Sequence, residues 1–245
     1  MTFDPFDDFE TKGYLRNTAR QKNRAIVRQM EHSAFTTAIA DVFADLEKRK
    51  TLTYEDVLNA HKALFEPVYP WAGEDRLKQA PDKAISKGDG DLEVRFADPP
   101  DIKRSIDWAL QRGQDKKFMA SNPGSIMGYL AYGHPFLDGN GRTIIVIHCV
   151  LAHRAKISID WAATSKIDYL MALTRELHDP DKGHLDAYLM PFIGKALDHN
   201  ALPANVCGAP GLDGEGEDHV LGQTDDPKLK AEYDSQRLKR RETIG

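Results

Sequence analysis

Residues 134–143 read HPFLDGNGRT, and they run directly into the apolar stretch IIVIHCVLA at residues 144–152. The apolar character continues to Ala155 without a turn residue, which is longer than a typical strand. We therefore predict a helix over residues 142–155. A helix that is apolar on all sides is buried, so this one should lie at the centre of the fold. Its N-terminus then falls inside the polar decapeptide.

That placement has a chemical consequence for the decapeptide. A helix N-terminus presents N–H groups without intrahelical partners at the positive end of a dipole, and together they bind anions. Gly139 and Gly141 let the backbone approach a phosphate closely, and Arg142 adds a guanidinium suited to phosphate oxygens. Asp138 offers a hard oxygen ligand for Mg²⁺, and His134 can take a proton near neutral pH.

These groups predict a phosphoryl- or nucleotidyl-transfer site. The chain has no GxxxxGK(S/T) match, so the site is not a P-loop. A tight Gly-Asn-Gly turn with surface charges around it is the weaker alternative, because it leaves the histidine, aspartate and arginine beside a buried helix unexplained.

The composition argues against several classes of protein, among them nucleic-acid-binding, disulfide-rich and membrane-spanning proteins. The 245 residues carry a net charge of −5 at pH 7, which gives no general attraction to nucleic acid or an anionic membrane. The two cysteines, Cys149 and Cys207, lie far apart in the sequence and form no disulfide framework or zinc motif. The acidic N-terminus lacks the features of a signal peptide, and the longest apolar run is far below the roughly 18 residues of a membrane span. We expect a cytoplasmic protein with no membrane partner, and export as an effector stays open.

Helical periodicity dominates the rest of the chain. Alternating apolar residues around a Gly-Asp-Gly-Asp tip predict one β-hairpin at residues 83–96. Thr53 and Asp56 form a box-like capping pair at the start of a second helix. Apolar residues at three- and four-residue spacings predict further helices at 17–49, 53–68, 99–113, 122–132, 164–177 and 185–200.

The C-terminal part differs in composition. Residues 201–226 are rich in Gly, Pro, Asp and Glu, which predicts a linker. Residues 227–245 are charged with few apolar side chains, so we expect an exposed helix or a disordered tail. The basic run at residues 237–241 is more typical of a solvated tail end than of a nucleic-acid contact.

The sequence HPFLDGNGR at residues 134–142 matches the motif HPFx(D/E)GN(G/K)R, so the chain resembles the Fic family. The turn YPWAGEDR at residues 69–76, and the hairpin followed by FADPP at residues 96–100, also resemble Fic proteins. The resemblance implies a Fic domain over residues 13–200. It implies an all-α fold, a helical bundle with a small β-hairpin flap.

Most Fic proteins transfer AMP from ATP to a hydroxyl of a target protein and release pyrophosphate. By this resemblance, His134 is the base that deprotonates a Ser, Thr or Tyr of the target, and Asp138 binds Mg²⁺. The backbone of residues 139–141 (Gly139, Asn140 and Gly141) holds the α-phosphate region, and Arg142 contacts the distal phosphates. Phe136 anchors the loop in the core.

The resemblance also implies partners. The flap residues Ile85, Ser86, Lys87 and Gly88 would pair with an extended segment of the target by strand addition. Many Fic proteins are restrained by a helix with the motif (S/T)xxxE(G/N), from the same chain or a small antitoxin. Thr51 and Glu55 fit part of this pattern, but helix capping explains them better. A partner could therefore supply the inhibitory helix.

One departure concerns the residue three positions after Arg142. AMP-transferring members often carry a second arginine there, which orients the γ-phosphate, and this chain has Ile145. The apolar residue leaves three alternatives: AMP transfer, transfer of another group such as phosphate, and a degenerate domain that binds nucleotide or protein without turnover. The phosphate-transferring Doc branch tends to have Ala and Lys where this chain has Gly139 and Gly141, which favours AMP transfer.

Overall fold

A computed structural model describes residues 16–88, 93–180, 182–212, 218–223 and 226–244. Within these residues the chain is mainly helical with small sheets, as predicted. None of the described helices combines the length and apolar character needed to cross a bilayer.

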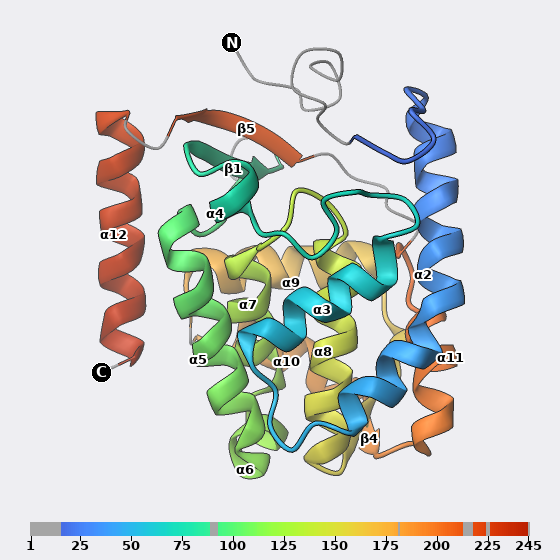
Figure 1. Cartoon of the computed structure of the whole chain (residues 1–245). Helices are drawn as coiled ribbons and strands as arrows, with labels where there is room; N and C mark the ends of the chain where they lie inside the picture. Colours follow the sequence, from blue (N-terminus) through green and yellow to red (C-terminus); the bar gives the residue numbers. More distant parts are fainter. Residues whose placement is uncertain (1–15, 89–92, 181, 213–217, 224–225, 245) are drawn as a thin grey trace.

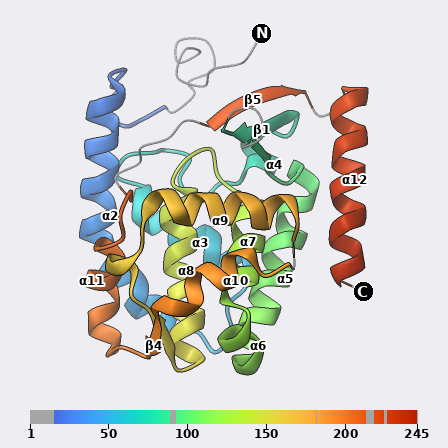
Figure 2. The same cartoon turned by 180° about the vertical axis from the view of Figure 1, so that it is seen from behind.

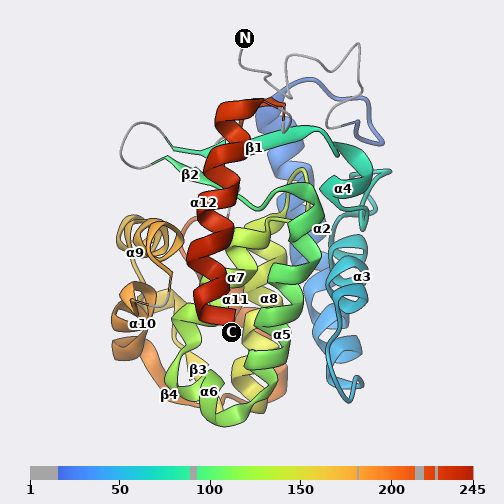
Figure 3. The same ribbon diagram turned by 90° about the vertical axis from the view of Figure 1, so that its left-hand side faces the viewer.

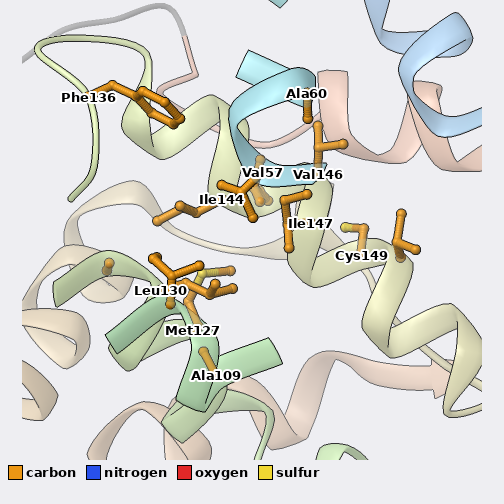
Figure 4. Packing of buried hydrophobic residues seen from close by; sticks show 14 of the residues in the cluster. Val57, Ala60, Ala109, Met127, Leu130, Phe136, Ile144, Val146, Ile147 and Cys149 are labelled. Atoms are coloured by element: carbon orange, nitrogen blue, oxygen red, sulfur yellow. The ribbon is translucent and has the colours of Figure 1, made fainter. Parts of the chain in front are cut away.

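The helix predicted at residues 142–155 is α8 (Asn140–Arg154), and it is the central helix of the fold. It packs against α2 (Arg24–Glu47), α3 (Tyr54–Phe65), α5 (Ile102–Gln114) and α7 (Pro123–Gly133), which surround it in Figure 1. From behind, α9 (Lys166–His178) crosses the same core (Figure 2). Ile144, Val146 and Ile147 of α8 point into the apolar cluster between these helices (Figure 4).

The first long helix begins later than its periodicity predicted. Residues 17–23 precede α2 because Asn17 closes a turn on Gln21 and Arg20 adopts a positive φ of 52°. Asn23 then caps α2 through a hydrogen bond from Ala25 N–H. The capping box of Thr53 at α3 is present as expected.

The predicted hairpin consists of β1 (Lys83–Lys87) and β2 (Val94–Arg95), which project from the helical body in Figure 3. Short α4 (Arg76–Gln79) precedes it, and η2 (Pro99–Asp101) leads from it into α5. A further strand, β5 (Asp218–Gln223), pairs antiparallel with the other edge of β1, which gives a three-stranded sheet of order β2-β1-β5.

The prediction of one helix at residues 185–200 is wrong. The segment divides into α10 (His184–Leu189), η4 (Met190–Phe192), β4 (Ile193–Lys195) and η5 (His199–Ala201). Pro191 cannot donate an N–H to a continuing helix, which ends α10 at this point. β4 instead pairs antiparallel with β3 (Ile157–Ile159), and η3 (Trp161–Ala163) leads from β3 to α9. Another short helix, α6 (Lys116–Ser121), connects α5 to α7.

The C-terminal region contains further regular elements. Residues 201–226, expected as a linker, contain α11 (Leu202–Cys207) and β5. Residues 227–244 form α12 (Pro227–Ile244), which lies along the helical body in Figure 3, with most of its described side chains exposed. Arg237 pairs with Asp98 at 2.7 Å and with Asp101, and the Arg240 guanidinium covers the Tyr132 ring at 3.6 Å. The basic run thus begins with side chains that bind the helical body.

Candidate functional site

The N-terminus of α8 opens directly onto the predicted site. Gly139 precedes the helix with a φ of +76°, and a Cβ there would lie 2.7 Å from the Phe65 ring, so only glycine fits. A Cβ built on Gly141 meets no atom within 4 Å, which places its backbone against open space. The first turn of α8 therefore presents backbone that a ligand can approach closely.

Asn140 fixes the loop through its side chain. Its Oδ1 accepts a hydrogen bond from Phe136 N–H at 2.8 Å, and its amide donates to Phe136 O at 2.7 Å. The Phe136 ring is completely buried and stacks on the His61 imidazole, with centroids 3.7 Å apart. These two hydrogen bonds hold the Asn140 side chain against the loop and fix the approach of the chain to α8.

His61 of α3 supports the same loop, a role that the sequence did not reveal. Its Nδ1 accepts a hydrogen bond from Gly73 N–H at 2.9 Å, so the ring proton resides on Nε2, which donates to Asp138 O at 3.0 Å. Complete burial lowers the pKa of His61 to about 3, which keeps the imidazole neutral. The ring thus connects α3 to the loop that carries Asp138.

Arg76 holds the other end of the loop, a role that the sequence did not reveal. The Arg76 backbone N–H donates to Pro135 O, and its Nε donates to His134 O, each at 2.7 Å. Its Nη2 donates to Ala97 O at the end of the hairpin, also at 2.7 Å. This buried guanidinium therefore fixes the backbone of His134 relative to the flap.

His134 itself lies at the end of α7 with a left-handed backbone, at φ 40° and ψ 59°. Its ring stacks on Phe96 of the flap, with centroids 3.6 Å apart and an interplanar angle of 11°. The residue is 6% exposed. Its orientation is therefore set by the stacked ring on one side and by the Arg76-bound backbone on the other.

A cavity of about 230 Å³ brings most of the predicted site together. Its lining includes His134, Asp138, Gly139, Asn140, Gly141 and Arg142, and of the flap residues it includes Lys87. Ile85, Ser86, Gly88 and Phe136 are not part of the lining. Ile145 is, so an apolar surface takes the position one turn after Arg142.

Arg142 has a buried partner that the sequence did not reveal. Its Nη2 lies 3.0 Å from Glu31 Oε1 on α2, and its guanidinium lies over the Phe65 ring at 4.8 Å. Tyr69 OH donates to the same Glu31 carboxylate at 2.7 Å. Burial and the nearby Asp138 charge raise the pKa of Glu31 to about 7. The spacing of apolar residues in the sequence does not show that this glutamate is buried.

Asp138 is the candidate metal ligand. Its side chain is 34% exposed, and Oδ1 accepts the Gly139 N–H and lies 3.7 Å from Arg142 Nη2. Within the described residues, no group of three or more His, Cys, Asp or Glu side chains could enclose a metal ion. A single accessible carboxylate suits Mg²⁺, because this ion usually keeps waters and binds substrate phosphates as well.

The outer edge of the flap strand is occupied. Ile85 pairs with Val220 and Ser86 with His219, and the pairing continues from Lys83 to Lys87. β2 covers the opposite edge of β1 at Ser86 and Lys87. The backbone groups that strand addition would use are thus paired with the chain itself.

Comparison with known proteins shows which family this chain resembles. Residues 51–152 match the model of the Fic/DOC family. The chain is 33% identical over 167 residues to the protein adenylyltransferase VbhT of Bartonella schoenbuchensis, a match that covers 64% of this chain and 32% of VbhT. It is 25% identical over 170 residues to the probable protein adenylyltransferase y4lH of Sinorhizobium fredii, covering 66% of this chain and 82% of that protein.

Solved structures have the same fold. The N-terminal Fic domain of a putative cell filamentation protein from Bartonella quintana, with bound ADP, gives a TM-score of 0.62 at 19% identity and covers 76% of this chain and 94% of that one. BepC from Bartonella tribocorum, with bound AMPPNP, gives 0.56 at 16% identity and covers 73% and 91%. Residues 51–152 therefore match the Fic/DOC family model, as the motif predicted, and the described chain has the helical fold of these Fic domains. The match spans about a third of the length of VbhT.

Proposed function

We propose that this chain transfers AMP from ATP to a Ser, Thr or Tyr hydroxyl of a target protein and releases pyrophosphate. The observation that carries the proposal is the cavity in which His134, Arg142 and the N-terminus of α8 meet. The names of VbhT and y4lH, both described as adenylyltransferases, support the same activity.

In this proposal, the first turn of α8 binds the α-phosphate. The N–H groups of the first turn of α8 have no intrahelical partner, Gly141 borders open space, and the helix dipole adds positive potential there. Arg142 contacts the phosphates beyond it. These contacts orient the phosphorus and stabilise the negative charge that develops on its oxygens.

His134 takes the proton from the target hydroxyl. As the hydroxyl oxygen bonds to the α-phosphorus, the bond between that phosphorus and the bridging oxygen of pyrophosphate breaks. The stacked Phe96 ring and the Arg76-bound backbone hold the imidazole in one orientation, which this proton transfer requires. The imidazolium then loses its proton to solvent.

Asp138 would hold Mg²⁺ through its carboxylate, and the phosphates and waters would complete the coordination. The ion would neutralise charge on the leaving pyrophosphate. Asp138 is held for this role from both sides, because its backbone oxygen accepts the His61 hydrogen bond and its Oδ1 accepts the Gly139 N–H.

We also propose that the target adds an extended segment to the flap at residues 85–88. Such docking on β1 requires β5 to leave the edge that it occupies. The division into a Fic domain at 13–200, a linker at 201–226 and a C-terminal tail at 227–245, the cytoplasmic location and an inhibitory antitoxin stay predictions that accompany this proposal.

Labelled ATP tests the proposed reaction. We would incubate the protein with a cell lysate and α-labelled or γ-labelled ATP, beside His134→Ala and His134→Asn variants. Asn tolerates the left-handed backbone of residue 134, so this second variant separates loss of the base from backbone strain. AMP transfer predicts protein labelling from α-labelled ATP alone. Labelling from γ-labelled ATP indicates phosphate transfer. If the wild type labels proteins no more than the two variants do, His134 is not the catalytic base.

A further inference from the structure

The candidate cavity carries an excess of positive charge. Among the described residues that line it, the cationic side chains are Arg24, Arg28, Lys87, Arg142 and Lys166, and the acidic ones are Glu31 and Asp138. The whole chain has a net charge of −5, so this excess is local to the cavity. A cavity of this kind attracts a polyanion, and the phosphate chain of a nucleotide is one.

Arg142 alone is a weak clamp for several phosphates. Its guanidinium already faces the Glu31 carboxyl group at 3.0 Å, so part of its hydrogen-bonding capacity is used before a phosphate binds. Ile145 lies on the same helix one turn further on and contributes an apolar surface to the cavity. Within the lining, α8 therefore supplies no cation beyond Arg142, and further positive charge has to come from another element.

The N-terminal part of α2 supplies it. Arg24 lies three and four residues before Val27 and Arg28, and Glu31 lies four and three residues after them, so the four share one face of the helix. All four line the cavity. Further along, the same face is the buried stripe that includes Phe35 and Ile39. The two arginines thus lie on the inward face of α2, where the helix extends past the core and meets the cavity. Both side chains are partly buried.

We propose that Arg24 and Arg28 form a second cationic clamp, which binds the distal phosphates of a nucleoside triphosphate whose α-phosphate lies at the N-terminus of α8. This inference rests on the proposed function for the position of the nucleotide. The two arginines contact the phosphate chain from α2, the helix that also carries Glu31, the partner of Arg142. In this arrangement the arginines of α2 supply the positive charge around the distal phosphates, and the apolar Ile145 supplies none.

Nucleotides of different phosphate length test the clamp. We would measure binding of AMP, ADP and ATP, each with Mg²⁺, by calorimetry with the wild type and the Arg24→Ala/Arg28→Ala variant. Alanine keeps the helix of α2, because it has the highest helix propensity. The matched control is Lys116→Ala/Lys117→Ala, which removes two exposed charges from α6 at the far end of the molecule in Figure 1.

Loss of charge-assisted contacts to the distal phosphates should weaken ATP binding by roughly tenfold to a hundredfold and leave AMP binding within about threefold. The control should bind all three nucleotides as the wild type does. Unchanged ATP binding in the arginine variant overturns the clamp while the proposed function stands. Equal losses for AMP and ATP overturn the assignment to distal phosphates. A wild type that binds no nucleotide overturns the proposed function and the clamp together.

A rescue variant adds an independent readout. Adding Ile145→Arg to the Arg24→Ala/Arg28→Ala background restores a cation to the cavity from the α8 side. We expect the preference for ATP over AMP to recover at least partly. Thermal unfolding shows whether the triple variant is as stable as its parent variant. If it is, and the preference for ATP does not recover, the distal phosphates do not lie between α2 and residue 145.

Discussion

The Arg142 guanidinium lies 3.0 Å from the Glu31 carboxylate, and both side chains are almost completely buried. The pair joins the first turn of α8 to α2 through two residues that lie more than a hundred positions apart in the sequence. Tyr69 donates to the same carboxylate, so the arginine is held by a network and does not depend on a single flexible contact. Glu31 is therefore a positioning residue for Arg142.

Removing this carboxylate should destabilise the protein. Glu31→Ala leaves a buried guanidinium without its partner and the Tyr69 hydroxyl without an acceptor, which should cost about 3–5 kcal/mol. Glu31→Gln keeps an amide oxygen for both donors and should cost less than half of that. Urea unfolding of the two variants measures the difference. A loss below about 1 kcal/mol for Glu31→Ala would show that the pair contributes little to folding.

The same residue predicts a pH dependence of stability. Burial raises the pKa of Glu31 from 4.5 to about 7, so between these values the folded protein holds a proton that the unfolded chain has released. The contribution of this carboxyl to stability is therefore complete below pH 4.5 and is lost as the pH rises through about 7. The loss is at most about 3 kcal/mol.

Glu31→Gln cannot titrate, so it isolates this effect. The difference in unfolding free energy between the wild type and Glu31→Gln should shift in favour of the variant as the pH rises from 4.5 to about 7. Parallel curves over this range would show that Glu31 stays ionised throughout.

Two glycines of the motif allow a matched comparison. Gly139→Ala forces a side chain into a positive φ and places Cβ 2.7 Å from the Phe65 ring, so it should destabilise the fold by about 2 kcal/mol or more. Gly141→Ala meets no atom within 4 Å and lies inside α8, so the fold should keep its stability or gain up to about 1 kcal/mol.

Gly141→Ala, the variant that keeps its stability, should nevertheless bind nucleotide more weakly than the wild type. The added methyl at residue 141 projects into the space from which a phosphate approaches, so Gly141→Ala should weaken ATP binding in a fully folded protein. Calorimetry with Mg-ATP, beside thermal unfolding, makes the comparison. Wild-type affinity in Gly141→Ala would exclude close phosphate contact at this backbone.

The pairing of β5 with β1 predicts an effect on target docking. Two prolines, His219→Pro/Val220→Pro, remove adjacent N–H groups that point to opposite sides of the strand, so at least one ladder bond to β1 is lost. If targets dock on β1, release of this edge should increase transfer of label from α-labelled ATP to lysate proteins. The control, His219→Ala/Val220→Ala, keeps both N–H groups and should behave as the wild type. Reduced transfer in the proline variant would instead indicate that β5 forms part of the docking sheet.

The sequence predicted the parts of the fold that local chemistry determines. The buried α8, the hairpin and the capping box of Thr53 followed from apolar runs, turn residues and side-chain capping. The motif also placed His134, Asp138 and Arg142 on one cavity, because ten consecutive residues around a helix N-terminus have few ways to arrange themselves.

The remainder depended on contacts between distant segments. Glu31, Arg76 and His61 support the motif from other elements, and in the sequence they look like ordinary polar residues of helices and turns. β5 was hidden in a segment whose Gly, Pro and acidic composition favours a linker, because a strand at a sheet edge is specified by its partner as much as by its own residues. Long-range pairing of this kind leaves no periodic signal.

The central claim is that this chain transfers AMP from ATP to a protein hydroxyl, with His134 as the base. Intact-mass analysis after incubation with Mg-ATP and a lysate, which also reports modification of the chain itself, tests it most directly. The account predicts protein species heavier by one AMP residue with the wild type and none with His134→Asn. Species heavier by a phosphate, or AMP-modified species formed equally by His134→Asn, would contradict it.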